Sequence, residues 1–213
     1  MLLRLYTYEL RADIEQEFVT FIREHSIDYV RRQPGVVAAW FGRREVGAGG
    51  DYVAVTCWRD FETMRSAIGS DLERPIFAPP GREMDVAGSA RHFETIDEPA
   101  VGSGTGGTAL RLLRGRITPG REEEVYASIR REGWPLLDRL SGLVDARIGR
   151  QASRDGDVIL HVTIWEDRDA LRKGTGGKLQ RPLMPMPPDS FTVESIDHYD
   201  IIESSIAPVE VPG

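Results

Sequence analysis

The sequence has very little cysteine, which limits what can hold the fold together. Cys57 is the only cysteine among 213 residues, so an internal disulfide cannot form and no second thiol exists for a zinc site. We therefore expect packing alone to hold the fold, in a reducing compartment, with Cys57 as buried packing. Clusters of histidine, cysteine and carboxylate are also lacking, so we expect no metal site.

Long apolar runs and blocks of basic charge are missing too. No apolar run approaches the roughly 18 to 20 residues that span a bilayer, and the first residues lack the features of a secretion signal. The net charge is −7, and arginines are scattered among acidic residues, so the basic patch of a nucleic-acid binder is absent. We expect a soluble, cytoplasmic protein whose partners include neither membrane nor nucleic acid.

What the sequence does contain is an internal repeat. Trp58 aligns with Trp165 at an offset of 107 residues, within matching segments at 53–60 and 160–167. The same offset superposes Arg4 on Arg111, each between two leucines, and the Arg-Pro pair at 74–75 on the pair at 181–182. We expect repeats at 1–97 and 108–204, a Gly/Ser-rich linker at 98–107 and a tail at 205–213.

Each repeat shows the pattern β-α-β-β-α-β of a ferredoxin-like unit. The first is expected to have strands at 2–10, 36–43, 52–58 and 91–96, with a glycine-rich turn at 47–50 between its middle strands. Helix starts are expected at the capping pairs Asp13/Gln16 and Thr118/Pro119, and at Asp60 and Asp167. The fold class is therefore α+β.

The third strands, which end in Thr-x-Trp-x-Asp and run into a short helix, carry a resemblance to a known family. The chain resembles the antibiotic biosynthesis monooxygenase group of the dimeric α+β barrel superfamily, present as a tandem duplication. The resemblance implies two ferredoxin-like repeats in a dimeric-α+β-barrel-type arrangement within one chain, with a pocket between the sheets. A homodimer of the fused chain is a further association that such a fold allows.

Strand alternation predicts which side chains would line that pocket. We expect the aliphatic positions to face the helices, and on the third strands these are Val53, Val55 and Cys57 with Leu160, Val162 and Ile164. On the second strands they are Val37, Ala39 and Phe41 with Val144, Ala146 and Ile148. The opposite face would then look into the pocket, and it is more polar and aromatic than a structural core requires.

Candidate site residues follow from that face. For substrate binding they are Tyr6, Tyr8, Trp40, Tyr52, Trp58, Arg111 and Trp165, and for catalysis His161, Asp145 and Arg147. The tryptophans suit stacking on an aromatic ring, although they are equally explained as packing. His161 paired with Asp145 suits proton abstraction, and Arg147 or Arg111 suits holding an anion. The repeated Arg4 and Arg111 also fit a structural salt bridge, and periodicity leaves the direction of His92 and His198 open.

The resemblance implies a monooxygenase without a cofactor that acts on a polycyclic aromatic or phenolic, polyketide-like small molecule. A related haem-degrading group uses a first-strand asparagine and a second-helix histidine, whereas the corresponding residues here are Tyr6 or Leu113 and Ile68 or Thr175. Haem degradation is therefore disfavoured. The alternatives are a non-catalytic barrel that binds a small molecule or haem, and a non-oxidative polyketide cyclase or isomerase of the same fold.

Overall fold

The computed structural model describes residues 1–44, 51–77, 86–97 and 106–206. The predicted glycine-rich turn at 47–50 lies outside the described residues, as do most of the predicted linker and the end of the predicted tail. Among the described residues, no helix is long and apolar enough to cross a membrane.

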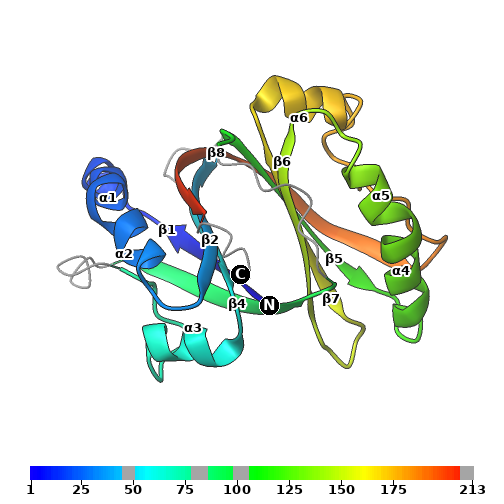
Figure 1. Ribbon diagram of the computed structural model, residues 1–213, viewed down its shortest axis with the longest axis horizontal. Helices are drawn as coiled ribbons and strands as arrows, with labels where there is room; N and C mark the ends of the chain where they lie inside the picture. The colour runs from blue at the N-terminus through cyan, green and yellow to red at the C-terminus, as the bar shows by residue number, and fades with distance from the viewer. Residues whose placement is uncertain (45–50, 78–85, 98–105, 207–213) are drawn as a thin grey trace, which may run out of the picture. The chain divides into compact units, whose positions relative to one another are not determined.

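Both halves of the chain follow the predicted order of elements (Figure 1). The first half contains β1 (Leu2–Glu9), α1 (Glu15–Phe21), the π-helix η1 (Ile22–Ser26), α2 (Ile27–Arg31), β2 (Val36–Arg44), β3 (Asp51–Trp58), α3 (Phe61–Ile68) and β4 (Ala87–Thr95). The second contains β5 (Ala109–Ile117), α4 (Glu122–Ser128), the π-helix η3 (Ile129–Gly133), α5 (Trp134–Leu137), β6 (Leu143–Gln151), β7 (Val158–Trp165), α6 (Arg168–Gly174) and β8 (Phe191–Ile206). The α+β class with two ferredoxin-like sets of elements is confirmed.

The offset read from the sequence recurs in the elements themselves. The bounds of α1, η1, β2 and β3 each reappear 107 residues later as α4, η3, β6 and β7. The π-helices are the least expected of these elements because a turn of this kind is rare. Such turns are found often at functional sites. Both copies place it at the same point of the first helix.

Two compact units divide the chain. Unit 1 comprises Met1–His92 with Ile201–Gly213, and unit 2 comprises Phe93–Asp200. The division predicted from the sequence lies in the linker at 98–107, and the predicted second repeat ends at 204. In the structure, the divisions fall inside β4 and inside β8, so each of these strands supplies residues to both units.

The sheet of unit 1 has β3 at its centre. It pairs antiparallel with β1 and with β2, and β4 lies beside β1 while the end of β8 lies beside β2. The helices pack on one face, where Phe18, Ile22 and Val30 are buried against strand residues. This aromatic-rich layer is the core of unit 1.

Unit 2 has the strand order β8-β5-β7-β6-β4, all antiparallel where the register is defined. Helices α4 and α5 run along one face of this sheet (Figure 1). Val125 of α4, Ile129 of η3 and Leu137 of α5 are buried against Ile148 and Ile159 of the sheet.

Two of the four predicted helix starts are confirmed. The carboxylates of Asp60 and Asp167 accept hydrogen bonds from the backbone N–H of Thr63 at 2.8 Å and of Ala170 at 2.7 Å, which are N-cap bonds that satisfy free donors. The capping pairs predicted at Asp13/Gln16 and Thr118/Pro119 are wrong. The helices there begin at Glu15 and Glu122 without any side-chain cap.

Candidate functional site

The strand register of unit 1 reverses the predicted faces of β1 and β3. Tyr6 pairs with Ala54 and Tyr8 with Tyr52, and all four pack in the same core as Phe18 of α1. Directly opposed residues share a face of the sheet. The aromatic face of β1 and β3 is therefore the one that the helices cover, and the expectation that it points away from them is wrong.

The same correction places Trp58 and Trp40 on opposite faces of the sheet. Trp58 belongs to the helix-covered core, whereas Trp40 pairs with Val55 on the other face of the sheet. The prediction for β2 was right, because Ala39 and Phe41 do pack in the helix-covered core. The two tryptophans, which the sequence analysis placed in one pocket, lie on opposite faces and are both fully buried.

The physical reason is that the strands are buried on both faces. Every residue of β7 and all but the first residue of β3 are buried, so the aliphatic residues of either face look equally suited to a core. In addition, the register shifts between Val36 and Ala38 and between Leu143 and Asp145. Such bulges change the phase of alternation between neighbouring strands.

In unit 2 the strand register likewise places the three predicted catalytic residues on two different faces of the sheet. His161 pairs with Leu113 and with Ile148 on the helix-covered face, whereas Asp145 pairs with Ile164 and Arg147 with Val162 on the other face. The predicted pairing of His161 with Asp145 is therefore wrong.

Asp145 and Arg147 form a buried ion pair with each other. The Nε and Nη2 atoms of Arg147 donate to the two carboxylate oxygens of Asp145 at 2.8 and 3.0 Å. Burial raises the pKa of Asp145 and the guanidinium of Arg147 opposes that rise. A buried pair of this geometry satisfies both charges and needs no ligand.

Arg4 and Arg111 share one structural role in the two units. The guanidinium of Arg4 donates to the carbonyl oxygens of Leu72, at 3.2 Å, and of Arg74. That of Arg111 donates to the carbonyl oxygens of Leu179, at 3.4 Å, and of Arg181, at 2.6 Å. Each arginine thus holds the loop that follows the short second helix. The expected structural role is present, with carbonyl oxygens as the partners in place of a carboxylate.

The repeated Thr-x-Trp motif forms a hydrogen bond within the strand. The Nε1–H of Trp58 donates to Thr56 Oγ1 at 2.8 Å, and that of Trp165 donates to Thr163 Oγ1 at 3.0 Å. Because the indole donor is satisfied in this way, each tryptophan is buried without a polar cost. The bond also fixes the orientation of each ring on the helix-covered face.

His161 is the one predicted catalytic residue on that face, and its side chain is unsatisfied. It is 1% exposed, and its Nε2 has no hydrogen-bond partner among the described residues. Burial, with a smaller effect of the Arg111 guanidinium, lowers the pKa of His161 to about 3. The imidazole is therefore neutral at physiological pH.

Arg111 lies next to His161 on the neighbouring strand. It pairs with Thr163, and His161 pairs with Leu113, so Arg111 and His161 are diagonal neighbours on one face. Burial lowers the pKa of Arg111 to about 10, which leaves the guanidinium charged at neutral pH. Its Nη1 has no partner among the residues that the structure describes.

The register also settles the direction of His198. It pairs directly with Arg111, and therefore lies on the helix-covered face of unit 2. His92 of unit 1 is close enough to Arg4 and Glu73 for their charges to act on it, and burial lowers its pKa.

The predicted binding residues Tyr6, Tyr8 and Tyr52 are packed into a cluster of aromatic rings in unit 1. The ring centroids of Tyr8 lie 4.5 Å from Tyr6 and 5.3 Å from Phe18, and Phe18 lies 5.3 Å from Tyr52. Phe77 stacks on Tyr8 at 5.7 Å. The Tyr52 hydroxyl donates to Glu15 at 2.7 Å, which together with burial raises the pKa of Tyr52. These rings fill the layer between helices and sheet.

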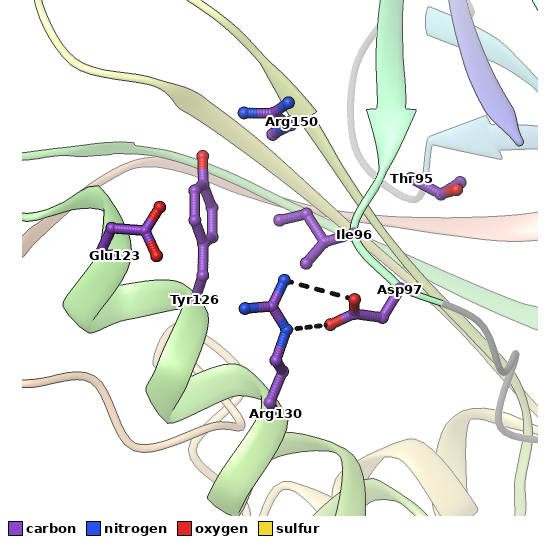
Figure 2. Close-up of a pocket in the computed structure, with 7 residues that line it drawn as sticks. All are labelled: Thr95, Ile96, Asp97, Glu123, Tyr126, Arg130 and Arg150. Carbon is purple, nitrogen blue, oxygen red and sulfur yellow. Dashed lines mark hydrogen bonds and ion pairs between the residues drawn. The ribbon is translucent and has the colours of Figure 1, made fainter.

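Unit 2 has a pocket of about 290 Å³ at the margin of its helix-covered face (Figure 2). It is lined by Thr95, Ile96, Asp97, Glu123, Tyr126, Arg130 and Arg150. Within this lining, Arg130 Nε and Nη2 donate to the carboxylate of Asp97 at 2.6 and 3.3 Å. The Tyr126 ring points toward Arg150, whose guanidinium carbon lies 5.8 Å from the ring centroid.

The pocket adjoins the layer that contains His161. Its wall residues Ile96 and Tyr126 pack in the same cluster as Ile148 and Ile159, and Ile148 is the cross-strand neighbour of His161. The Tyr126 hydroxyl donates to Asp157, and burial with this bond raises the pKa of Tyr126 to about 12.

Sequence reasoning missed these pocket residues. Tyr126 lies on α4 and Arg130 on η3, whereas strand alternation predicts site residues on strands alone. A usable signal was present, because Tyr126 stands where the first repeat has Val19 and is thus an aromatic residue gained by the second repeat. Within the described residues, no group of histidine, cysteine and carboxylate side chains could hold a metal ion.

Comparison with known proteins supports the fold. No family model matches the sequence, and no curated protein matches it closely enough to count as a relative. Solved structures do match. A protein from Lactobacillus acidophilus described as a candidate monooxygenase has a TM-score of 0.65 at 11% identity, over 96% of each chain. This protein has the same fold as that structure.

Two further structures agree with that conclusion. An anthrone oxidase-like protein matches with a TM-score of 0.57 at 12% identity, over 99% of this chain and 94% of its own. A ferredoxin-fold protein from Listeria monocytogenes, described as uncharacterized and related to antibiotic biosynthesis monooxygenases, matches with a TM-score of 0.50 at 8% identity, over 94% of each chain. At these identities the likeness establishes the fold of the chain and leaves its chemistry to the site.

Proposed function

We propose that the protein is a monooxygenase that needs no cofactor and oxidises a polycyclic aromatic phenol on the helix-covered face of unit 2. One observation carries this proposal. Among the buried polar atoms on that face, His161 Nε2 and Arg111 Nη1 have no hydrogen-bond partner within the described residues. Buried polar atoms are nearly always paired in folded proteins, and an unpaired set calls for a ligand or a catalytic role.

The two groups suit the activation of a phenol. The neutral His161 imidazole accepts the proton of the substrate hydroxyl at Nε2, and the charged Arg111 guanidinium stabilises the phenolate that forms. An anion bound beside the imidazole raises the low pKa that His161 has in the empty site. Trp165, held by Thr163, supplies a flat apolar surface for the aromatic rings.

The reaction that fits is oxidation by molecular oxygen, with the substrate as the electron donor. The electron-rich phenolate passes electrons to oxygen, and an anthrone methylene with one O₂ gives a quinone carbonyl and one water. The name of the anthrone oxidase-like structural relative agrees with this class of substrate. The pocket of Figure 2 is the proposed access route, since its wall contacts the layer around His161.

Oxygen uptake with a panel of anthrones and hydroxynaphthalenes tests the proposal. The wild-type protein should consume oxygen in the presence of a substrate, and His161→Ala should lower kcat by about 100-fold or more, the usual contribution of a general base. Unchanged turnover in His161→Ala would remove this residue from the mechanism. Conversion without oxygen would instead identify a cyclase, and binding without any conversion a binding protein.

Haem does not fit the residues present as well as a phenol does. The second-helix positions that correspond to the histidine of the haem-degrading group are Ile68 and Thr175, and neither side chain ligates iron. His161 is 1% exposed, and its direct cross-strand partners, Leu113 and Ile148, are aliphatic. Titration with haem should therefore give no Soret band typical of histidine ligation.

A further inference from the structure

We infer that only unit 2 holds the ligand site, and that the equivalent place in unit 1 is filled by that unit's own side chains. The inference rests on the proposed function for the class of ligand, a phenolic aromatic molecule. Its support is the comparison of the two units position by position, at the offset of 107 residues that their elements share.

The histidine on the third strand, which the proposed mechanism needs, exists in one unit only. The counterpart of His161 is Ala54, and the counterpart of its cross-strand neighbour Leu113 is Tyr6. In unit 1 the Tyr6 ring lies beside the arginine, with its centroid 5.1 Å from the guanidinium carbon of Arg4. Unit 1 thus has an aromatic ring next to its arginine and lacks the histidine.

The surrounding layer has changed in the same direction. Each ring of the aromatic cluster of unit 1 is matched in unit 2 by a smaller or more flexible side chain. The pairs are Tyr8 with Gly115, Phe18 with Val125, Phe21 with Ser128, Tyr52 with Ile159, and Phe77 with Met184. Because a packed core loses stability when side-chain volume is removed without replacement, the loss of so many rings in one unit favours an occupant other than the chain.

Part of the volume is taken up by residues of unit 2, in ways that leave room to adapt. The Met184 side chain lies against the backbone of Gly133 in the π-helix, and methionine is the most easily rearranged of the apolar side chains. Phe191 covers Gly115. Unit 2 has gained the aromatic residues Tyr126 and Trp134. Tyr126 is buried and lines the pocket, and Trp134 is partly buried.

The pockets of the two units differ accordingly. The pocket at the margin of the unit 2 layer measures about 290 Å³. A pocket among the described residues of unit 1 measures about 50 Å³ and is lined in part by Phe77, a member of the aromatic cluster. A hydroxylated bicyclic or tricyclic molecule needs the larger of these spaces.

Isothermal titration of the full-length protein with 1-naphthol tests the inference without any need for turnover. We expect one molecule bound per chain. His161→Ala should weaken binding at least tenfold, the effect of losing one hydrogen bond inside a buried site, and His161→Leu should do the same with the buried volume kept. A control change in the aromatic cluster of unit 1, Phe18→Leu, should leave the stoichiometry at one and the Kd within twofold.

A stoichiometry of two, or binding that responds to Phe18→Leu and not to the His161 variants, would overturn the inference. Circular dichroism and a cooperative thermal transition confirm that each variant is folded. If one naphthol binds per chain and no oxygen is consumed with any substrate, the proposed function fails while the assignment of the site to unit 2 stands.

Discussion

Burial of His161 makes the stability of the folded protein depend on pH. The pKa is lowered to about 3 in the folded protein, against about 6.5 in an unfolded chain. The unfolded state therefore binds a proton between these values that the folded state does not. The contribution to stability is complete above pH 6.5 and is lost as the pH falls from 6.5 toward 3.

Replacing this imidazole by a hydrocarbon of similar size should remove that dependence. We expect His161→Leu to have a free energy of unfolding close to that of the wild type at pH 7.5, and to exceed it by about 2–3 kcal/mol at pH 4.5. Urea unfolding at the two pH values measures the difference. Asp145, whose pKa is raised, is present in both proteins and cancels in the comparison. Parallel pH profiles of the two proteins would show that His161 is protonated when folded.

Several residues of the proposed site were candidates from the sequence alone, and their predicted grouping was wrong for His161 and Asp145. Recurrence at a fixed offset identified Arg111 and Trp165, and divergence at that offset identified His161. The face of the sheet on which each side chain lies could not be predicted, because β3 and β7 are buried on both faces. In such strands the alternation of apolar and polar residues does not distinguish one face from the other. As a result, Asp145 was grouped with a histidine that lies on the opposite face.

At the scale of elements, the short second helices were easier to place than the first helices. Asp60 and Asp167 identify the starts of their helices, because a carboxylate directly before a helical stretch commonly accepts the N-cap hydrogen bond. Helices α1 and α4 begin without such a bond, so their starts had no local signal. Their π-turns also had none, since the sequences there show an ordinary helical spacing of apolar residues.

Helix α6 depends on a glycine where it meets the tryptophan of unit 2. A Cβ atom at Gly174 would overlap the Cζ3 and Cη2 atoms of the Trp165 ring. We expect Gly174→Ala to cost about 1–3 kcal/mol of stability through overpacking, and to shift the fluorescence of the displaced Trp165. The matched residue of unit 1 is Ala67, and Ala67→Gly should cost no more than about 1 kcal/mol, the effect of glycine in a helix. Equal and small effects of the two changes, measured by urea unfolding, would contradict the close approach.

At the scale of the molecule, the end of the last strand, β8, belongs to unit 1, the unit that also contains the first residues of the chain. Ile201–Gly213 belongs to unit 1, the end of β8 lies beside β2, and Ile202 packs against the aromatic-rich core of unit 1. The sequence analysis treated residues up to 204 as part of the second repeat, because a linear repeat assigns each strand to the copy in which it is read. Hydrogen bonds between strands that are far apart in the sequence form in the folded sheet, and a repeat pattern does not predict them.

This arrangement predicts the effect of shortening the chain. A protein that ends at Asp200 loses the strand neighbour of β2, so the β2 amides that face β8 should lose their protection from hydrogen exchange, while the amides of β5 and β7 in unit 2 should keep theirs. A protein that ends at Ile206 retains all of β8 and should match the full chain in β2. Hydrogen exchange measured by NMR or mass spectrometry on the two truncated proteins makes the comparison. Full protection of β2 in the shorter protein would show that β8 contributes nothing to unit 1. Loss of protection in β5 and β7 would show that the end of β8 supports unit 2 as well.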